Sequence, residues 1–288
     1  MPGVADVAPE QLRVVHPITE CEAFKSLYWS GELPGMVPNL VFVNRDGSVA
    51  FESNEAGLKG DPLDPARKLA VVWGDSVVFG AGRGWAHLLD DLAPGWQFLN
   101  GGLEGDPYTN ILRRAAAFNE SHQVGLNLLM LGWHPFVPPR EPTNGRATGI
   151  LPHSGNENVR AELTRFLRRV PNTVVLTMPT PLNRRIVNTD LSPYLVEGDY
   201  EHAFRFLGKL PYRQDGQRWA FEHIEERNAI TREVCAKLGV RLVDLAAALD
   251  TEDQPDFREN FLDAVHIRPR AFPLVAQTIH AAVKDLLA

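Results

Sequence analysis

The chain has only two cysteines, Cys21 and Cys235, and they lie far apart among its 288 residues. Two cysteines are too few for a disulfide framework, and neither belongs to a cluster with metal-ligand spacing. The sequence also lacks an uninterrupted apolar run of about 18 residues, the length that a membrane-spanning helix needs. These absences exclude a disulfide-stapled scaffold, and we expect no membrane insertion.

Basic residues are also in deficit. The 36 Asp and Glu outnumber the 29 Lys and Arg, which gives a formal net charge of -7. Nucleic acids and anionic membrane surfaces are bound through clustered Lys and Arg, so neither is an expected partner. Residues 1–10 show no cationic start followed by an apolar core, the pattern of a signal peptide, and we expect a cytoplasmic protein.

What the chain does contain is typical of a globular protein. Apolar residues make up 44% and charged residues 23% of the sequence, which is ordinary for a folded domain. The length suits one large α/β domain, alone or with an appendage. Residues 1–65 are rich in proline and show no regular alternation of strands and helices, apart from a predicted hairpin over 40–51. We therefore predict an N-terminal extension over 1–65, packed on a main domain over 66–288.

The main domain alternates between strand-like and helix-like segments. Short, uninterrupted apolar runs are typical of parallel strands buried on both faces. Such runs occur at residues 69–73, 96–100, 125–131, 173–178 and 240–243. Helices are predicted at residues 85–92, 107–119, 157–169, 217–238 and 271–287. Strands that alternate with helices predict a three-layer α/β/α sandwich with a five-stranded parallel sheet.

The first of these strands ends abruptly at Gly74-Asp75-Ser76. A glycine directly after a buried strand lets the backbone turn sharply at the carboxyl edge of the sheet, where open α/β sheets bind ligands. Ser76 is therefore a candidate nucleophile. The same tripeptide is also an ordinary turn or helix cap, so the interpretation depends on the rest of the chain.

A second polar pair, Asp263 and His266, lies between the fifth strand and the last helix. A serine hydroxyl becomes a good nucleophile when an imidazole takes its proton and a further acceptor fixes the imidazole tautomer. Two residues three apart in a tight loop can supply both groups. The alternative is an Asp that caps the last helix beside an incidental surface His.

In this order, the motifs resemble those of the SGNH or GDSL hydrolases, from about residue 54 to the C-terminus. Gly74-Asp75-Ser76 is similar to the first family block, whose serine is the nucleophile. Residues 100–106 resemble the second block, in which Gly105 matches the glycine that lends its N–H to the oxyanion hole. Asp263 and His266 match the last block, which supplies the base and its partner.

The resemblance implies a flavodoxin-like sandwich and a serine hydrolase that acts on a carboxylic ester, such as an acetylated sugar or metabolite. Ser76 would attack the carbonyl carbon while His266, oriented by Asp263, takes its proton, and no cofactor is expected. Two alternatives stay open. One is an O-acyltransferase with the same triad, in which a hydroxyl compound replaces water. The other is a catalytically inactive binding protein of the same fold.

The third block departs from the family pattern. The family usually has Gly-x-Asn-Asp here, with the Asn side chain as an oxyanion donor, whereas this chain has Gly132-Trp133-His134-Pro135. A neutral imidazole can donate one N–H. The resemblance therefore implies an oxyanion hole made by the N–H groups of Ser76 and Gly105, with His134 as a third donor.

Four of these side chains could converge on a metal ion instead, namely Asp75, His134, Asp263 and His266. Sets of His and carboxylate ligands bind zinc. No H-E-x-x-H or similar signature is present, and a serine triad explains three of the positions without a metal. We predict no metal site.

Two loop insertions are candidates for substrate recognition. The first, over 135–154, is rich in Pro and Gly and emerges beside the predicted site. The second, over 182–216, combines basic and aromatic residues that could bind a sugar, an anionic group or a nucleotide-bearing donor, and a solvated lid is an equally good interpretation. The candidate substrate-binding residues are Asp75, Trp133, Arg184 and Arg185.

Overall fold

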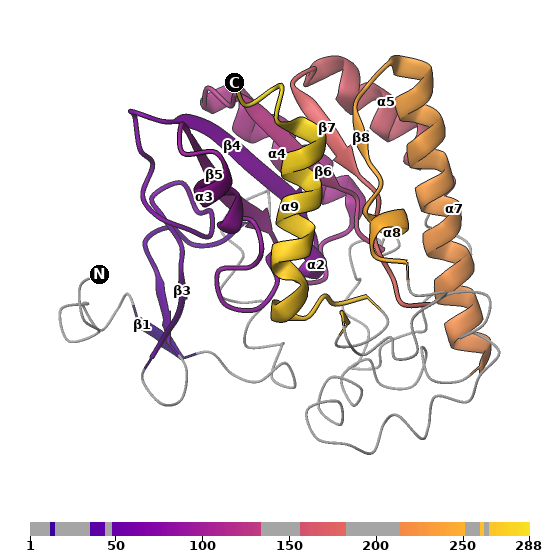
Figure 1. The fold of residues 1–288 in the computed structure, drawn as a ribbon, viewed down its shortest axis with the longest axis horizontal. Helices are drawn as coiled ribbons and strands as arrows, with labels where there is room; N and C mark the ends of the chain where they lie inside the picture. Colours follow the sequence, from indigo (N-terminus) through magenta and orange to yellow (C-terminus); the bar gives the residue numbers. More distant parts are fainter. Residues whose placement is uncertain are drawn as a thin grey trace, which may run out of the picture.

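The computed structural model describes residues 12–14, 35–43, 48–133, 156–182, 214–250, 260–261 and 265–288, with side chains at 35–43, 48–133, 156–182, 221–250, 260–261 and 265–288. A five-stranded parallel sheet in the order β5-β4-β6-β7-β8 forms its centre (Figure 1). The strands are β4 (Lys68–Gly74), β5 (Trp96–Gly102), β6 (Leu126–Met130), β7 (Thr173–Leu176) and β8 (Leu242–Val243). The predicted α/β/α sandwich is confirmed.

Burial on both faces explains why the strands read as uninterrupted apolar runs. β4 pairs in parallel with β5 on one side and with β6 on the other, so its backbone is fully enclosed. Its side chains alternate between two separate cores. Ala70 and Val72 face one layer of helices, whereas Val71 and Trp73 face the other.

Helices cover each face of the sheet. One layer consists of α3 (Leu88–Leu92), α8 (Leu245–Ala248) and α9 (Phe272–Val283), with α9 in front of the sheet in Figure 1. The other consists of α4 (Tyr108–Ser121), α5 (Val159–Arg169) and α7 (Gln214–Leu238). α5 shows the sequence logic. Its buried residues are Val159, Leu163, Phe166 and Leu167, a spacing that puts them on one helical face.

Several element boundaries differ from those predicted. β5 continues to Gly102, because Asn100, Gly101 and Gly102 still pair with the end of β4. Gly101 and Gly102, which follow the predicted strand over 96–100, therefore belong to β5 and not to the loop after it. α3 begins at Leu88, later than expected, and α9 begins at Phe272 after a short 3-10 turn, η7 (Pro269–Ala271).

A second, three-stranded sheet precedes the main one. Its strands are β1 (Leu12–Val14), β2 (Val41–Val43) and β3 (Val49–Glu52), and sequence reasoning missed β1. Phe42 and Phe51 of this sheet form a small core with Phe79 and Leu103, which belong to the main domain next to the end of β4. The domain division at residue 65 stays a prediction.

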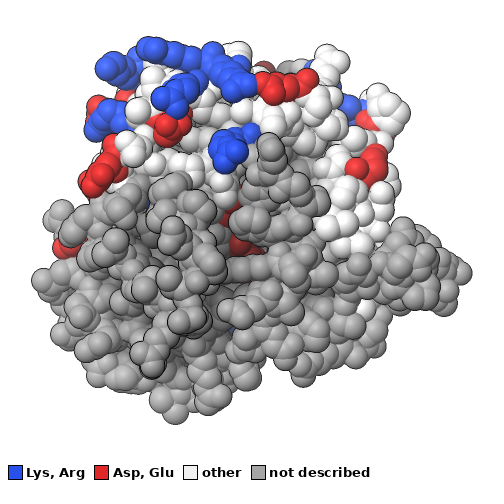
Figure 2. Space-filling view, turned by 180° about the vertical axis from the view of Figure 1, so that it is seen from behind, with Lys and Arg blue, Asp and Glu red and all other residues white. Residues whose placement is uncertain are grey.

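Seen from behind, the described surface carries Lys and Arg side chains along its upper rim (Figure 2). α5 contributes exposed arginines, of which Arg168 and Arg169 lie in its last turn. Cations at a helix C-terminus interact favourably with the helix dipole, and Arg169 also pairs with Glu120. In the described part of the chain, no helix combines the length and apolar character that crossing a bilayer requires.

Candidate active site

The predicted nucleophile begins a short helix at the end of β4. This helix, α2 (Ser76–Phe79), lies at the lower edge of the sheet in Figure 1. Asp75 is its N-cap, and the Asp75 carboxylate accepts the backbone N–H of Val77 at 3.0 Å. Ser76 is half-buried. It therefore stands where the strand-to-helix turn was expected to present it.

His266 is the predicted base, and the structure brings its imidazole to this serine. Its Nε2 lies 2.8 Å from Ser76 Oγ, although the two residues are 190 positions apart. The backbone around His266 is held by an antiparallel bridge between Phe261 and Ile267, and by a hydrogen bond from Arg268 N–H to the Asn260 carbonyl at 2.8 Å. The distance of 2.8 Å between Nε2 and Oγ is short enough for an imidazole to take the proton of a hydroxyl.

Several predicted site residues lie outside the described residues. They are Asp263, His134, Arg184 and Arg185, together with the insertion at 135–154 and residues 183–213 of the second insertion. Their roles stay predictions. The described residues hold no group of three or more His, Cys, Asp or Glu side chains that could bind a metal ion. Two members of the alternative zinc set, His134 and Asp263, lie outside the described residues.

Asp75 ties two of the active-site turns together. Its second carboxylate oxygen accepts the backbone N–H of Trp133 at 3.1 Å, and its side chain is completely buried. The close approach depends on Gly132, whose φ is +68° and where a Cβ would lie 2.3 Å from the Asp75 oxygen. Because both oxygens are engaged, this burial argues against the substrate contact expected for Asp75. The Trp133 side chain is also buried.

The Asp75 carboxyl is completely buried, and burial and its neighbours affect its pKa in opposite directions. Burial raises the pKa of this carboxyl above its ordinary value, because the charged form loses its hydration. The hydrogen bonds from Val77 and Trp133 and the charges of His266 and Arg227 act in the opposite direction. Burial therefore destabilises the ionised form of Asp75, and its two N–H donors and the nearby positive charges offset part of that effect.

Gly105 lies in the loop that follows β5. It is exposed and has φ +66°, in the left-handed region that favours glycine. The loop is fixed beside the nucleophile turn by the Leu103 N–H, which donates to the Gly74 carbonyl at 3.1 Å. It is fixed again by Asp106, whose carboxylate receives two N–H groups of the buried Arg114 at 2.9 and 2.7 Å.

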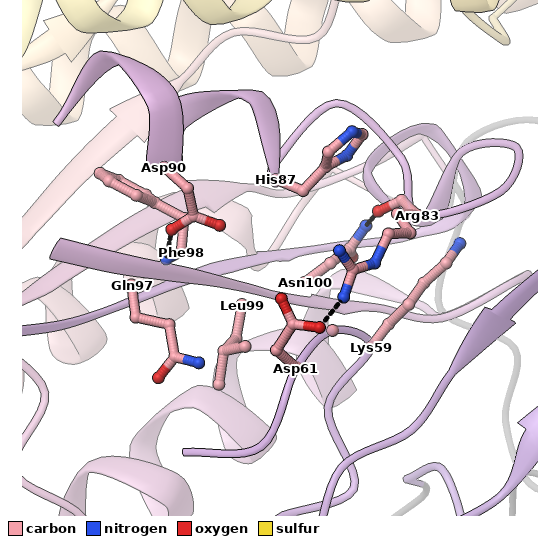
Figure 3. A pocket seen from close by; sticks show the side chains of 10 residues that line it. Lys59, Asp61, Arg83, His87, Asp90, Gln97, Phe98, Leu99 and Asn100 are labelled. Carbon is pink, nitrogen blue, oxygen red and sulfur yellow. Dashed lines mark hydrogen bonds and ion pairs between the residues drawn. The ribbon is translucent and has the colours of Figure 1, made fainter. Parts of the chain in front are cut away.

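Lys59 holds the far end of α2. Its Nζ donates to the carbonyls of Phe79 and Gly80 at 2.7 and 3.1 Å and lies 3.6 Å from the centre of the Phe79 ring. The side chain points away from the ion pair of Asp61 and Arg83 (Figure 3). Burial lowers its pKa well below that of an ordinary lysine.

Three buried basic side chains thus contact backbone carbonyls at the end of α2, at the end of β5 and in the turn after β6. Lys59 binds carbonyls at the end of α2, Arg114 binds the Gly101 carbonyl at 2.8 Å, and Arg227 binds the Gly132 carbonyl at 2.9 Å. Sequence reasoning found none of them. A lone cation in a sequence is usually a solvated surface residue, and nothing in the local pattern marks these three as buried.

No family profile and no curated protein matches the sequence. A lipase/acylhydrolase from Enterococcus faecalis matches the structure with a TM-score of 0.51 and 17% identity, over 76% of this chain and 96% of that one. A lipolytic G-D-S-L family member from Veillonella parvula is 16% identical, with a TM-score of 0.48 over 75% and 98% of the two chains. An acetyl xylan esterase is 16% identical, with a TM-score of 0.48, over 75% of this chain and 99% of that one.

The match to the Enterococcus protein shows that this chain shares the fold of a lipase/acylhydrolase. The predicted fold, a three-layer α/β/α sandwich with a five-stranded parallel sheet, is thereby confirmed. At this level of identity, the comparison concerns the fold alone.

Proposed function

We propose that the protein is a serine hydrolase that cleaves carboxylic esters. One observation carries the proposal, the 2.8 Å contact between Ser76 Oγ and His266 Nε2 at the carboxyl edge of the parallel sheet. A half-buried serine at the start of a helix, with an imidazole at hydrogen-bond distance, is the arrangement that nucleophilic catalysis requires. The predicted triad partner is Asp263.

The reaction has two halves. Ser76 Oγ attacks the ester carbonyl carbon while its proton passes to His266 Nε2, and the leaving alcohol then takes that proton as its bond to the acyl carbon breaks. A water molecule attacks the acyl-enzyme in the same way, which releases the acid and regenerates Ser76. No cofactor takes part in either half.

The negative oxygen that forms in each half needs hydrogen-bond donors. We assign this role to the N–H groups of Ser76 and Gly105, with His134 as the third donor. The fixed loop around Gly105 supports its part in this assignment, because a donor that is already in place costs no reorganisation during the reaction. The substrate class that we propose is a small acyl ester, such as an acetyl group on a sugar or metabolite.

Labelling with a fluorophosphonate, read by intact mass, tests the proposal. We expect one adduct per wild-type chain, no adduct on Ser76→Ala, and strongly reduced labelling of His266→Ala. Ser121→Ala is the matched control, because the exposed Ser121 Oγ also lies 2.9 Å from an imidazole nitrogen, that of His122. Its labelling should equal that of the wild type. A folded wild-type protein that takes no label would overturn the proposal.

A further inference from the structure

The turn that follows β6 is held from behind by α7. Arg227 donates from Nη1 to the Gly132 carbonyl at 2.9 Å, and His223 Nε2 lies 3.0 Å from the Trp133 carbonyl. The two side chains come from successive turns of α7, four residues apart. Arg227 is 2% exposed and its guanidinium lies 5.1 Å from the ring centre of Tyr108, so it is enclosed on all sides.

Asn156, just before α5, sets the orientation of both α7 side chains. Its Oδ1 accepts from Arg227 Nε at 2.8 Å, and its Nδ2 donates to Glu226 at 2.7 Å and to the His223 carbonyl at 3.1 Å. The same amide lies 3.4 Å from His223 Nδ1. His223 Nε2 lies 3.0 Å from the Trp133 carbonyl, which accepts, and 3.2 Å from Arg227 Nη2, which donates, so the tautomer of His223 decides which of the two hydrogen bonds forms.

The turn held in this way connects directly to the nucleophile. The N–H of Trp133 donates to Asp75, and Asp75 is both the residue before Ser76 and the cap of α2. Side chains of α7 thus lie at the carbonyls of Gly132 and Trp133, while the Asp75 side chain accepts the Trp133 N–H. A shift of this turn would move the Asp75 carboxylate, and with it the Ser76 turn.

We propose that Arg227 is a positioning residue of the reaction, which acts with His223 by fixing the Gly132–Trp133 turn against Asp75 beside the nucleophile. The inference rests on the proposed serine hydrolase function. Arg227 touches no reacting atom. It acts through the backbone of the turn, so its loss changes the placement of groups that meet the transition state more than it changes the binding of the ester.

The chemistry of the cluster fits this role better than a contribution to stability alone. Burying a guanidinium is costly, and a well-packed apolar group in its place is often as stable or more so. Among the hydrogen bonds described for Arg227, the guanidinium meets a backbone carbonyl, an amide oxygen and an imidazole. Its electrostatic partners include Asp75. A planar donor with fixed geometry suits the orientation of a carbonyl.

The test compares Arg227→Gln and Arg227→Lys with Arg232→Gln. Arg232 lies one and a half turns further along α7, where it forms a half-exposed ion pair with Asp244, and it serves as the matched control. Turnover of p-nitrophenyl acetate is measured per active site, with the sites counted by fluorophosphonate labelling. The inhibition constant of an alkylboronic acid, which mimics the tetrahedral intermediate, is measured in parallel.

We expect Arg227→Gln to lose up to about 100-fold in kcat per labelled site, with KM changed by less than about threefold. Boronic acid affinity should fall in proportion to kcat/KM, because both report transition-state placement. Arg227→Lys keeps one donor for the Gly132 carbonyl and should retain more activity than Arg227→Gln. Arg232→Gln should match the wild type per labelled site.

An Arg227→Gln protein that is folded and turns over within twofold of the wild type per labelled site would overturn the proposal. So would an equal loss in Arg232→Gln. If Arg227→Gln does not fold, Arg227→Lys and His223→Gln decide instead, and wild-type kcat in both overturns the proposal. A wild-type protein that takes no label overturns the proposed function itself, an outcome distinct from the others.

Discussion

Asp75 accepts the backbone N–H of Trp133 at 3.1 Å, and so joins two turns that are 58 residues apart in the sequence. Replacing it with Asn puts an NH₂ group where one of the two carboxylate oxygens now meets an N–H, so a hydrogen bond becomes a donor–donor contact. We expect Asp75→Asn to lose about 1–3 kcal/mol of stability and a large part of its turnover. Urea unfolding and kcat per labelled site measure the two effects.

The same pair of proteins tests the charge of Asp75 through pH. Because burial raises the pKa of Asp75 in the folded state, the folded protein binds a proton more tightly than the unfolded chain. The stability of the wild type relative to Asp75→Asn should therefore fall as the pH rises from about 3.9, the ordinary Asp value, through the folded pKa. Urea midpoints between pH 4 and 7 show this, and a difference that grows with pH would contradict it.

Gly132→Ala should disrupt the same contact from the other side. The new Cβ would lie 2.3 Å from the Asp75 oxygen, in a backbone with φ +68°. The left-handed conformation alone costs about 1–2 kcal/mol for a residue with a Cβ, and the clash adds to it. Gly105→Ala has φ +66° and open space, so it shows the conformational cost alone, whereas Gly95→Ala has neither problem. The free energy of unfolding should be highest for Gly95→Ala, lower for Gly105→Ala and lowest for Gly132→Ala.

The sheet was predictable because each strand is a short apolar run buried on both faces, and β4 and β6 lie where the sequence placed them. β1 was missed because Leu12–Val14 is three residues long and gains its structure by pairing with β2. The ends of helices were less predictable than their existence, as α3 shows. A buried strand can be recognised from its own apolar residues, whereas a three-residue edge strand or the end of a helix depends on partners elsewhere in the chain.

The site was predictable only in part. Motif order placed Ser76 and His266 together, and the structure brings them within 2.8 Å of each other. The buried Lys59, Arg114 and Arg227 were not predictable, because their burial depends on carbonyls that the fold brings from elsewhere in the chain. On α7, His223, Glu226 and Arg227 read as an ordinary solvated helix surface. Their roles become visible only beside the Gly132–Trp133 turn.

Lys59→Met tests one of these buried basic side chains. It keeps the approximate length of the side chain but removes two hydrogen bonds to the carbonyls at the end of α2. The displaced carbonyls should loosen the nucleophile turn, and we expect kcat per labelled site to fall about 10-fold, a moderate case of misplacement. Burial lowers the pKa of Lys59, so the folded protein binds the proton less tightly than the unfolded chain. Wild-type stability relative to Lys59→Met should therefore rise with pH, from the folded pKa towards about 10.4. A flat or falling difference in urea unfolding between pH 7 and 10 would contradict this.

His134 is where the sequence departs from the family pattern, and substitutions there test its assignment as an oxyanion donor. One missing donor costs about 10²–10³ in kcat, so His134→Ala should lose turnover on that scale at little change in KM. His134→Asn supplies an amide N–H in place of the imidazole, and we expect it to recover most of the loss. The two variants also separate the donor role from general acid–base work, because an amide does not titrate between pH 5 and 9. If His134 acts as a donor, His134→Asn should follow the pH profile of the wild type. A His134→Asn protein as slow as His134→Ala, with both folded and fully labelled, would instead mean that the imidazole does more than donate a hydrogen bond.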